Sequence, residues 1–124
     1  KLSLELIETT AQYFSASKTA TFLRYKDLGD FPVMIIFIED GMIKWKSHSF
    51  DFPFKWLEYG GKVPAYTVAG DYYYRGVEEA NPVKVDAIEW FPEDYTLING
   101  NQKQKLWEQC FPTTRNSILT CLWL

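Results

Sequence analysis

The pattern of hydrophobic and polar positions is clearest between residues 32 and 54, where it predicts a β-hairpin. Residues 33–38 are all apolar and mostly β-branched, whereas residues 42–48 alternate between apolar and polar side chains. Asp40-Gly41 separates the two runs, and this pair readily adopts the positive φ angles of a type I′ turn. The first strand is therefore expected inside a sheet, and the second, which has one polar face, nearer an edge.

The turn also predicts how the two strands pair. With Asp40 and Gly41 as the loop, an uninterrupted ladder aligns the strands residue by residue, and facing side chains share one face. On one face, this register pairs Glu39 with Met42, Ile38 with Ile43, Ile36 with Trp45 and Met34 with Ser47. On the other face, it sets Val33, Ile35 and Phe37 against Lys44, Lys46 and His48.

Weaker patterns flank this hairpin. Apolar side chains at helical spacing predict an amphipathic helix over residues 4–14, and alternation predicts a strand over residues 19–27. After the hairpin, residues 54–59 predict a short helical turn that ends at Gly60-Gly61, since paired glycines do not sustain a helix.

The middle of the chain predicts further strands. Residues 65–69 and 72–75 form a second predicted hairpin around Gly70-Asp71, a pair suited to a type II′ turn. Residues 82–90 alternate and predict a half-buried strand.

The last part of the chain predicts a helix and then a buried strand. The late helix spans residues 99–111 and stops before Pro112, because a residue that precedes proline is displaced from helical geometry. Residues 117–124, SILTCLWL, are almost entirely apolar. They predict either a strand inserted inside the sheet or a surface covered by a second copy in a homodimer, and we favour insertion.

Together these elements predict a single α+β domain over residues 1–124. Its expected architecture is an antiparallel sheet of about five to seven strands, with one N-terminal helix and one late helix packed on it. A chain of 124 residues is long enough to bury a core without disulfides or metals.

Composition narrows the classes of partner. The net charge of −3 provides no basic field for nucleic acid or anionic lipid. No run approaches the roughly 18 apolar residues of a membrane helix, and the acidic N-terminal residues do not fit a signal peptide. A cytoplasmic protein is expected, although a leader removed before Lys1 would change that expectation. Cys110 and Cys121 are expected to be reduced and buried.

Chemical motifs are sparse. Nucleotide-binding loops, zinc motifs and serine-hydrolase motifs are absent from the sequence, so we expect neither a metal nor a cofactor. The single histidine, His48, precedes Asp51 by three residues, and this pair is the weak candidate for a general base. The acidic pairs at residues 78–79 and 93–94 fall in predicted loops and are interpreted as solvated.

Aromatic residues make up 18% of the chain, more than a small core needs. Tyrosine and tryptophan anchor protein interfaces, so the predicted binding residues are Trp56, Tyr59, Tyr66, Tyr72, Tyr73 and Tyr74. A sheet covered on both faces would instead bury three consecutive tyrosines without any binding role. Basic residues near these rings, Lys44, Lys46 and Lys62, leave a single-stranded nucleic-acid site as a weaker alternative.

These features favour a non-enzymatic protein-interaction module, such as a small adaptor, inhibitor or chaperone-like protein. The expected partner is another protein, and a homodimer is the alternative. A small enzyme using His48 and Asp51 is the second hypothesis, and a single-stranded nucleic-acid binder is the third.

Overall fold

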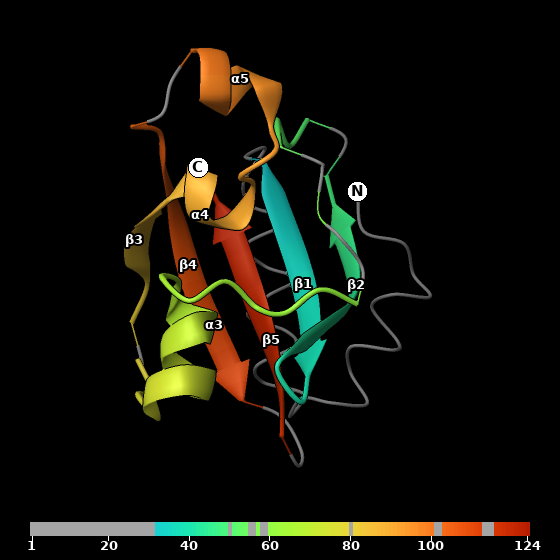
Figure 1. Cartoon of the computed structure of the whole chain (residues 1–124), viewed down its shortest axis with the longest axis vertical. Coiled ribbons are helices and arrows are strands. Elements are labelled where there is room, and N and C mark those ends of the chain that lie inside the picture. Colours follow the sequence, from blue (N-terminus) through green and yellow to red (C-terminus); the bar gives the residue numbers. More distant parts are fainter. Residues whose placement is uncertain are drawn as a thin grey trace.

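The fold is known from a computed structural model, which describes residues 32–49, 51–54, 57, 60–79, 81–100, 103–112 and 116–124. Five antiparallel strands form one sheet in the order β2-β1-β5-β4-β3, with short helices beside it (Figure 1). The predicted α+β class and antiparallel sheet are therefore confirmed. The elements are β1 (Val33–Glu39), β2 (Met42–His48), α3 (Val68–Gly70), the π-helix η1 (Asp71–Arg75), β3 (Val83–Asp86), α4 (Ala87–Trp90), α5 (Tyr95–Asn99), β4 (Lys105–Pro112) and β5 (Ser117–Trp123).

Strands β1 and β2 form the predicted hairpin. Asp40 and Gly41 both have positive φ angles, 53° and 76°, as a type I′ turn requires. Glu39 pairs with Met42, in the predicted register. The prediction that β1 is interior and β2 lies nearer an edge is also confirmed. In the strand order, β2 is at the edge of the sheet and β1 lies between β2 and β5.

Farther along the hairpin the predicted register is wrong. Ile38 pairs with Ile43, but Phe37 pairs with Trp45, so Lys44 is the extra residue of a β-bulge. Beyond it every pair shifts by one position, and the predicted pairs of Ile36 with Trp45 and Met34 with Ser47 are replaced by Ile36 with Lys46 and Met34 with His48.

The bulge moves Trp45 to the opposite face of the sheet. Its ring stacks on Phe37, with ring centroids 5.4 Å apart and planes at 19°. By the same shift, Lys46 and His48 pair with residues of the Met34–Ile36–Ile38 row. A one-residue insertion thus places an aromatic side chain where the uninterrupted pattern predicted lysine.

Strand β5 lies at the centre of the sheet, as its apolar sequence predicted. Ile35 of β1 pairs with Cys121, and Cys121 also pairs with Gln109 of β4. Every residue from Ser117 to Leu122 is buried. Insertion inside the sheet, the favoured alternative, is confirmed.

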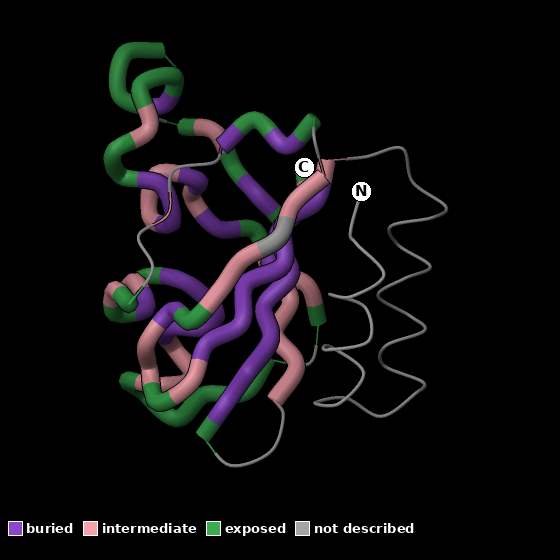
Figure 2. The backbone as a smooth tube through the Cα atoms, turned by 90° about the vertical axis from the view of Figure 1, so that its right-hand side faces the viewer, coloured by how far each residue is buried: buried purple, intermediate pink, exposed green. Residues whose placement is uncertain are grey.

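The two faces of the sheet carry separate clusters of buried side chains. Helices α3 and α4 lie over one face (Figure 1), and Figure 2 shows the buried strands running through the middle of the described chain. The larger cluster lies on the helix-covered face and includes Met34, Ile36, Ile38, Phe52, Phe54, Trp90, Phe91, Leu106, Ile118 and Leu122. The smaller cluster, on the other face, consists of Val33, Ile35, Phe37, Leu119 and Cys121, with Trp45, Phe111 and Trp123 beside it.

The predicted second hairpin around Gly70-Asp71 is wrong, because this segment is helical. Thr67 caps the helix, its Oγ1 accepting a hydrogen bond of 2.9 Å from the backbone N–H of Gly70. Gly70 has helical φ and ψ angles of −62° and −41°, so this residue is not part of a hairpin turn. A Cβ at this position would overlap the carbonyl oxygen of Pro64 and lie 2.7 Å from that of Ala65. Glycine is needed here for close backbone contact.

Two further predicted elements are corrected. The strand over residues 82–90 ends at Asp86 and continues as α4, which stops at Trp90 before Pro92. The late helix over residues 99–111 is instead strand β4, and the nearest helix is α5, which ends at Asn99. β4 is a strand because pairing with β3 and β5 on its two sides outweighs the helix propensity of its Gln and Lys residues.

Three predictions fall outside the described residues: the helix over residues 4–14, the strand over residues 19–27, and most of the helical turn over residues 54–59. In the part of the chain that the structure describes, no helix has the length and apolar character needed to cross a membrane.

Candidate functional site

A fully buried carboxylate, that of Glu108, organises the helix-covered face. Its Oε1 accepts hydrogen bonds from the backbone N–H of Val68 at 2.9 Å and from Nε1 of Trp90 at 3.1 Å. Its Oε2 accepts from the backbone N–H of Ala69 at 3.0 Å and from Oγ1 of Thr120 at 2.8 Å. One side chain of β4 therefore contacts α3, α4 and β5.

This network explains why helix α3 begins where it does. The first amides of a helix have no partner within the helix. Here the Val68 and Ala69 amides donate to Glu108, and the Gly70 amide donates to Thr67. The helix start is satisfied by side chains from two separate parts of the chain, which fixes α3 and η1 against β4.

Burial also changes the acidity of Glu108. Loss of solvent raises the pKa of its carboxyl above the ordinary value, and the hydrogen bonds from Trp90, Thr120 and the two amides only partly offset that rise. The group has no access to solvent and its oxygens are fully engaged. We therefore interpret Glu108 as a structural residue that supports the neighbouring pocket.

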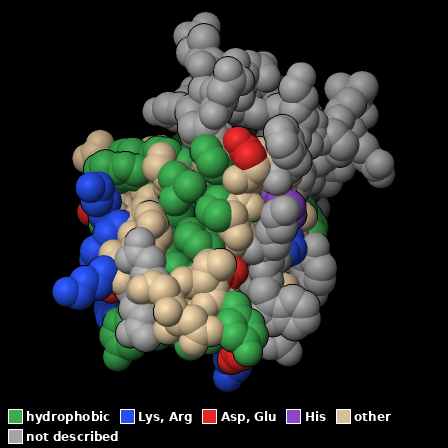
Figure 3. All heavy atoms as spheres, turned by 90° about the horizontal axis from the view of Figure 1, so that it is seen from above, with side chains coloured by type: hydrophobic (Ala, Val, Ile, Leu, Met, Phe, Trp, Pro, Cys, Tyr) green, Lys and Arg blue, Asp and Glu red, His purple; other side chains and the backbone are tan. Residues whose placement is uncertain are grey.

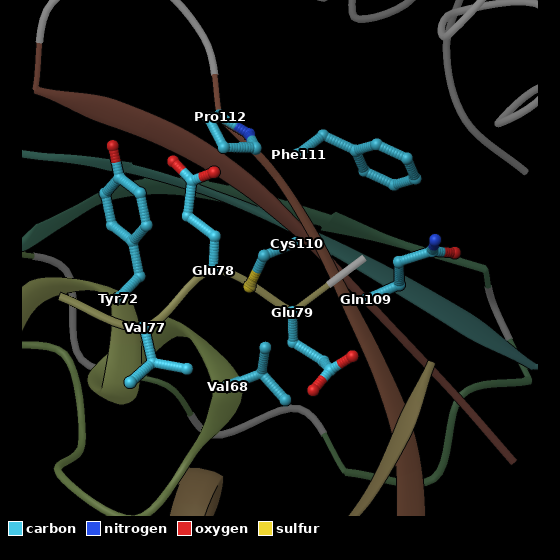
Figure 4. Close-up of a pocket in the computed structure, with 9 residues that line it drawn as sticks. All are labelled: Val68, Tyr72, Val77, Glu78, Glu79, Gln109, Cys110, Phe111 and Pro112. Atoms are coloured by element: carbon cyan, nitrogen blue, oxygen red, sulfur yellow. The ribbon is translucent and has the colours of Figure 1, made fainter. Parts of the chain in front are cut away.

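That pocket lies between η1, the segment that follows it, and the C-terminal half of β4 (Figure 4). It has a volume of about 350 Å³ and is open to solvent on one side, with mostly apolar walls. This size falls at the lower end of the range of small-ligand and side-chain pockets. The lining residues are Val68, Tyr72, Val77, Glu78, Glu79, Gln109, Cys110, Phe111 and Pro112.

The thiol of Cys110 lies in the pocket but is not an activated nucleophile. Its Sγ is 3.1 Å from Oγ1 of Thr120 and 3.5 Å from Oε2 of Glu108. Burial, and then the nearby carboxylate, raise the pKa of this thiol well above its ordinary value, so it stays protonated at neutral pH. Cys110 and Cys121 are both free cysteines, in agreement with the expectation of two reduced thiols.

Two exposed carboxylates border the pocket. In Figure 4 the Glu78 carboxylate points to the same side as Pro112, and the Glu79 carboxylate points to the opposite side, with Val68. Glu79 accepts a long hydrogen bond of 3.4 Å from the backbone N–H of Asn81. Among the described residues, neither glutamate forms an ion pair with a lysine or arginine.

The predicted tyrosines do not form one cluster. Tyr72 lines the pocket. The hydroxyl of Tyr73 lies 2.7 Å from the carbonyl oxygen of Asn116 and 3.2 Å from that of Ile38, so this residue fastens η1 to the hairpin end of the sheet. Its pKa is raised to about 12, chiefly by burial.

Tyr66 and Tyr74 are the exposed members of the group, at 72% and 51%. Tyr74 donates a hydrogen bond of 2.7 Å to the carbonyl oxygen of Val63, and Arg75 lies 5.7 Å from the ring centroid of Tyr66. Trp56 and Tyr59 lie outside the described residues.

The candidate base His48 lies away from this pocket. It is on β2, and strands β1 and β5 separate β2 from β4. Its Nδ1 is 2.8 Å from the carbonyl oxygen of Ser49, and the side chain of Asp51 is exposed. A general base formed by His48 and Asp51 stays a prediction.

The described residues provide no continuous basic groove. Lys44 projects from the β-bulge, whereas Lys62 lines a second pocket of about 280 Å³ together with Glu89 and Glu93. In Figure 3 the lysine and arginine side chains gather mainly along one margin of the visible surface. Within the described part of the chain, no group of three or more His, Cys, Asp or Glu side chains is placed to hold a metal ion.

Sequence reasoning identified only part of the pocket. Tyr72 was predicted as a binding residue, and the pair Glu78-Glu79 was interpreted as solvated. Val77 and Cys110 were missed, because the walls come from segments whose pairing is visible only in the folded sheet. The one sequence signal in this region was Glu108, a charged residue that follows the apolar Leu106 and Trp107 and precedes Gln109, Cys110 and Phe111, although it does not itself line the pocket. Comparison of the sequence with models of known protein families finds no match, and comparison with curated proteins finds none either.

Proposed function

We propose that this protein is a non-catalytic interaction module that binds a segment of a partner protein in the pocket between η1, residues 77–79 and β4. The observation that carries this proposal is the pocket itself, a half-open cavity of about 350 Å³ with apolar walls and a charged border. Such a cavity accepts one anchoring side chain of a partner, while the surrounding surface contacts its backbone.

The framework around the pocket supports a binding role because it is rigid. One wall is formed by η1, which continues directly from α3. The Glu108 network holds the start of α3, and the Tyr73 hydroxyl holds η1. The other wall is β4, which pairs with the central strand β5. A preformed site of this kind loses little conformational entropy when a partner binds.

A non-catalytic role also agrees with the chemistry of the lining residues. The Cys110 thiol is protonated at neutral pH, which is the opposite of what nucleophilic catalysis requires. The glutamates at the border are exposed, and neither shares a proton or a hydrogen bond with a second reactive group in the described residues.

The test is a comparison of partner capture by matched variants. Val77→Arg would fill the pocket from its border, and Val77 is 47% exposed, so the fold should tolerate the change. Tyr95→Arg places the same side chain on α5 at a residue that is 78% exposed and does not line the pocket. Each variant and the wild-type chain are used to capture proteins from source cells, with quantitative mass spectrometry as the readout.

We expect at least one protein that is retained by the wild-type chain and by Tyr95→Arg and lost by Val77→Arg. Purified, that protein should bind the wild-type chain directly and should shift the amide signals of residues 77–79 and 109–111 of the isotope-labelled chain. If no captured protein distinguishes the two variants, or if the protein that does leaves these amide signals unchanged, the pocket is not the binding site and the proposal fails.

A further inference from the structure

We propose that the pocket recognises a basic side chain, lysine or arginine, presented by the partner segment. This inference rests on the proposed function and specifies the chemistry of the anchoring residue. It places the aliphatic part of the side chain between Val68, Val77 and Tyr72, with the cationic group at one of the two border carboxylates, Glu78 or Glu79.

The first argument is charge complementarity. Both border carboxylates project from a short segment next to an apolar cavity. An anionic group in this pocket would face like charges, and a purely apolar group would gain no attraction from the border carboxylates. A cation is the group that this arrangement favours.

The second argument is that Arg75, the described cation next to the pocket-lining segment, is already engaged. Arg75 ends η1 just before the pocket-lining segment, but its Nη1 contacts Oδ1 of Asp71 and donates a hydrogen bond of 3.0 Å to the carbonyl oxygen of Ala65. Its guanidinium also lies over the Tyr66 ring. Elsewhere on the surface, Lys105 pairs with Asp86 at 2.6 Å. Two exposed aspartates thus have internal cationic partners, whereas the two pocket glutamates have none among the described residues.

The third argument is shape. Lysine and arginine combine an apolar stem with a charged end, and such side chains lie along apolar surface while the charge stays near water. The pocket matches this arrangement, because its walls are apolar and its exposed border is acidic. The Tyr72 ring in the wall adds a face over which a cationic group packs favourably.

The experiment uses positional-scanning peptide pools, acetyl-Xaa-Xaa-Zaa-Xaa-Xaa-amide, in which the central residue is fixed and the flanking residues are mixed. Pools with arginine or lysine at the centre are compared with pools that carry citrulline, norleucine, leucine or glutamate. Citrulline keeps the length of the arginine side chain, norleucine keeps the four-carbon stem of lysine, and neither carries a charge. Binding to the isotope-labelled full chain is followed through amide shifts of residues 77–79 and 109–111.

We expect the basic pools to bind roughly fivefold or more tightly than the neutral pools of equal length, since partly exposed charge pairs contribute modestly. The double variant Glu78→Gln/Glu79→Gln should abolish this preference, and raising the salt concentration should reduce it in the wild-type chain. Glu89→Gln/Glu93→Gln, which removes two carboxylates from the second pocket, is the matched control and should retain the preference.

The failure of this inference is distinct from the failure of the proposed function. If leucine, norleucine or citrulline pools shift the same amides as strongly as the basic pools, the pocket binds peptides but does not recognise charge. If the double glutamine variant keeps the preference, Glu78 and Glu79 do not confer it. If no pool shifts these amides, the inference is also overturned, while the capture experiment with Val77→Arg decides separately whether a partner uses the pocket.

Discussion

Trp90 and Glu108, from the helix α4 and the strand β4, meet in the core through a hydrogen bond of 3.1 Å between the indole Nε1 and the carboxylate Oε1. Both side chains are almost completely buried. A buried charge is costly unless its oxygens are fully engaged, and here the indole, two backbone amides and a hydroxyl all donate to it. The stability of the helix-covered face should therefore respond to the ionisation of this single group.

Glu108→Gln should make the stability of the protein less dependent on pH. Because the folded-state pKa of Glu108 is raised above its ordinary value of 4.5, the folded chain holds this proton more tightly than the unfolded chain. The contribution of Glu108 to the free energy of unfolding is fully present below about pH 4.5 and is lost as the pH rises through the folded-state pKa. In urea unfolding, the free energy of unfolding should fall more between pH 5 and pH 8 for the wild-type chain than for the variant.

At pH 5 the same substitution should lower the free energy of unfolding by about 1–3 kcal/mol, because a glutamine amide cannot accept from both the Val68 and Ala69 N–H groups. Equal pH dependence in the two proteins would show that Glu108 does not titrate differently in the folded chain.

Gly70→Ala should destabilise the protein, although helix propensity alone predicts the reverse. Gly70 has helical backbone angles, where alanine is ordinarily preferred by about 1 kcal/mol. The added Cβ, however, would collide with the carbonyl oxygen of Pro64, and we expect a net loss of about 1–3 kcal/mol. Thermal unfolding measures the sign directly. A raised melting temperature would mean that residues 64 and 65 move aside at no cost.

Tyr73→Phe should cost about 0.5–1.5 kcal/mol at neutral pH, the usual net value of a hydrogen bond. The loss of free energy of unfolding should lie at the lower end of this range, because the Asn116 carbonyl oxygen keeps the hydrogen bond of 2.9 Å from the Asp40 amide. The folded-state pKa of about 12 is above the ordinary 10.0, so the wild-type chain should lose stability as the pH rises from 10 to 12. In chemical unfolding between pH 10 and pH 12, the free energy of unfolding should fall less for Tyr73→Phe than for the control variant Tyr74→Phe.

Deleting Lys44 should be tolerated better than deleting Lys46. Lys44 is the extra residue of the bulge, and without it Ile43 still pairs with Ile38 and Trp45 with Phe37, now in a regular ladder. Deleting Lys46 would instead shift His48 by one position and reverse the face it occupies. Circular dichroism and melting temperatures of the two deletion variants compare the outcomes. Equal destabilisation would show that the bulge itself is required.

The sequence predicted the elements whose side-chain pattern and turn chemistry agreed. The hairpin tip at Asp40-Gly41 and the interior strand at residues 117–123 are of this kind, because each had both an apolar pattern and an unambiguous boundary. The register beyond Ile38 was not predictable, since a bulge adds one residue without any compositional signal. A single insertion was enough to exchange the faces of Trp45 and Lys46.

The errors in the second half of the chain have tertiary causes. Residues 105–112 contain helix-forming side chains, and they form a strand because two neighbouring strands pair with them. At Gly70 the glycine was interpreted as a turn residue, whereas its role is to let two backbone segments approach closely. The pocket could not be predicted from the sequence either, because only the packing of η1 against β4 brings Val77 and Cys110 together.

The central position of β5 has a consequence for how the protein folds. The hairpin β1–β2 and the pair β3–β4 are each local along the chain, but they join into one sheet only through β5, which follows both of them. Until β5 is synthesised and docked, β1 and β4 each present a strand with an open edge, and such edges pair readily with other chains. Assembly of the sheet is therefore non-local and should be slow, with its rate set by closure of the gap between the two halves. A ribosome-bound chain truncated before Ser117 should bind chaperones that the complete chain escapes.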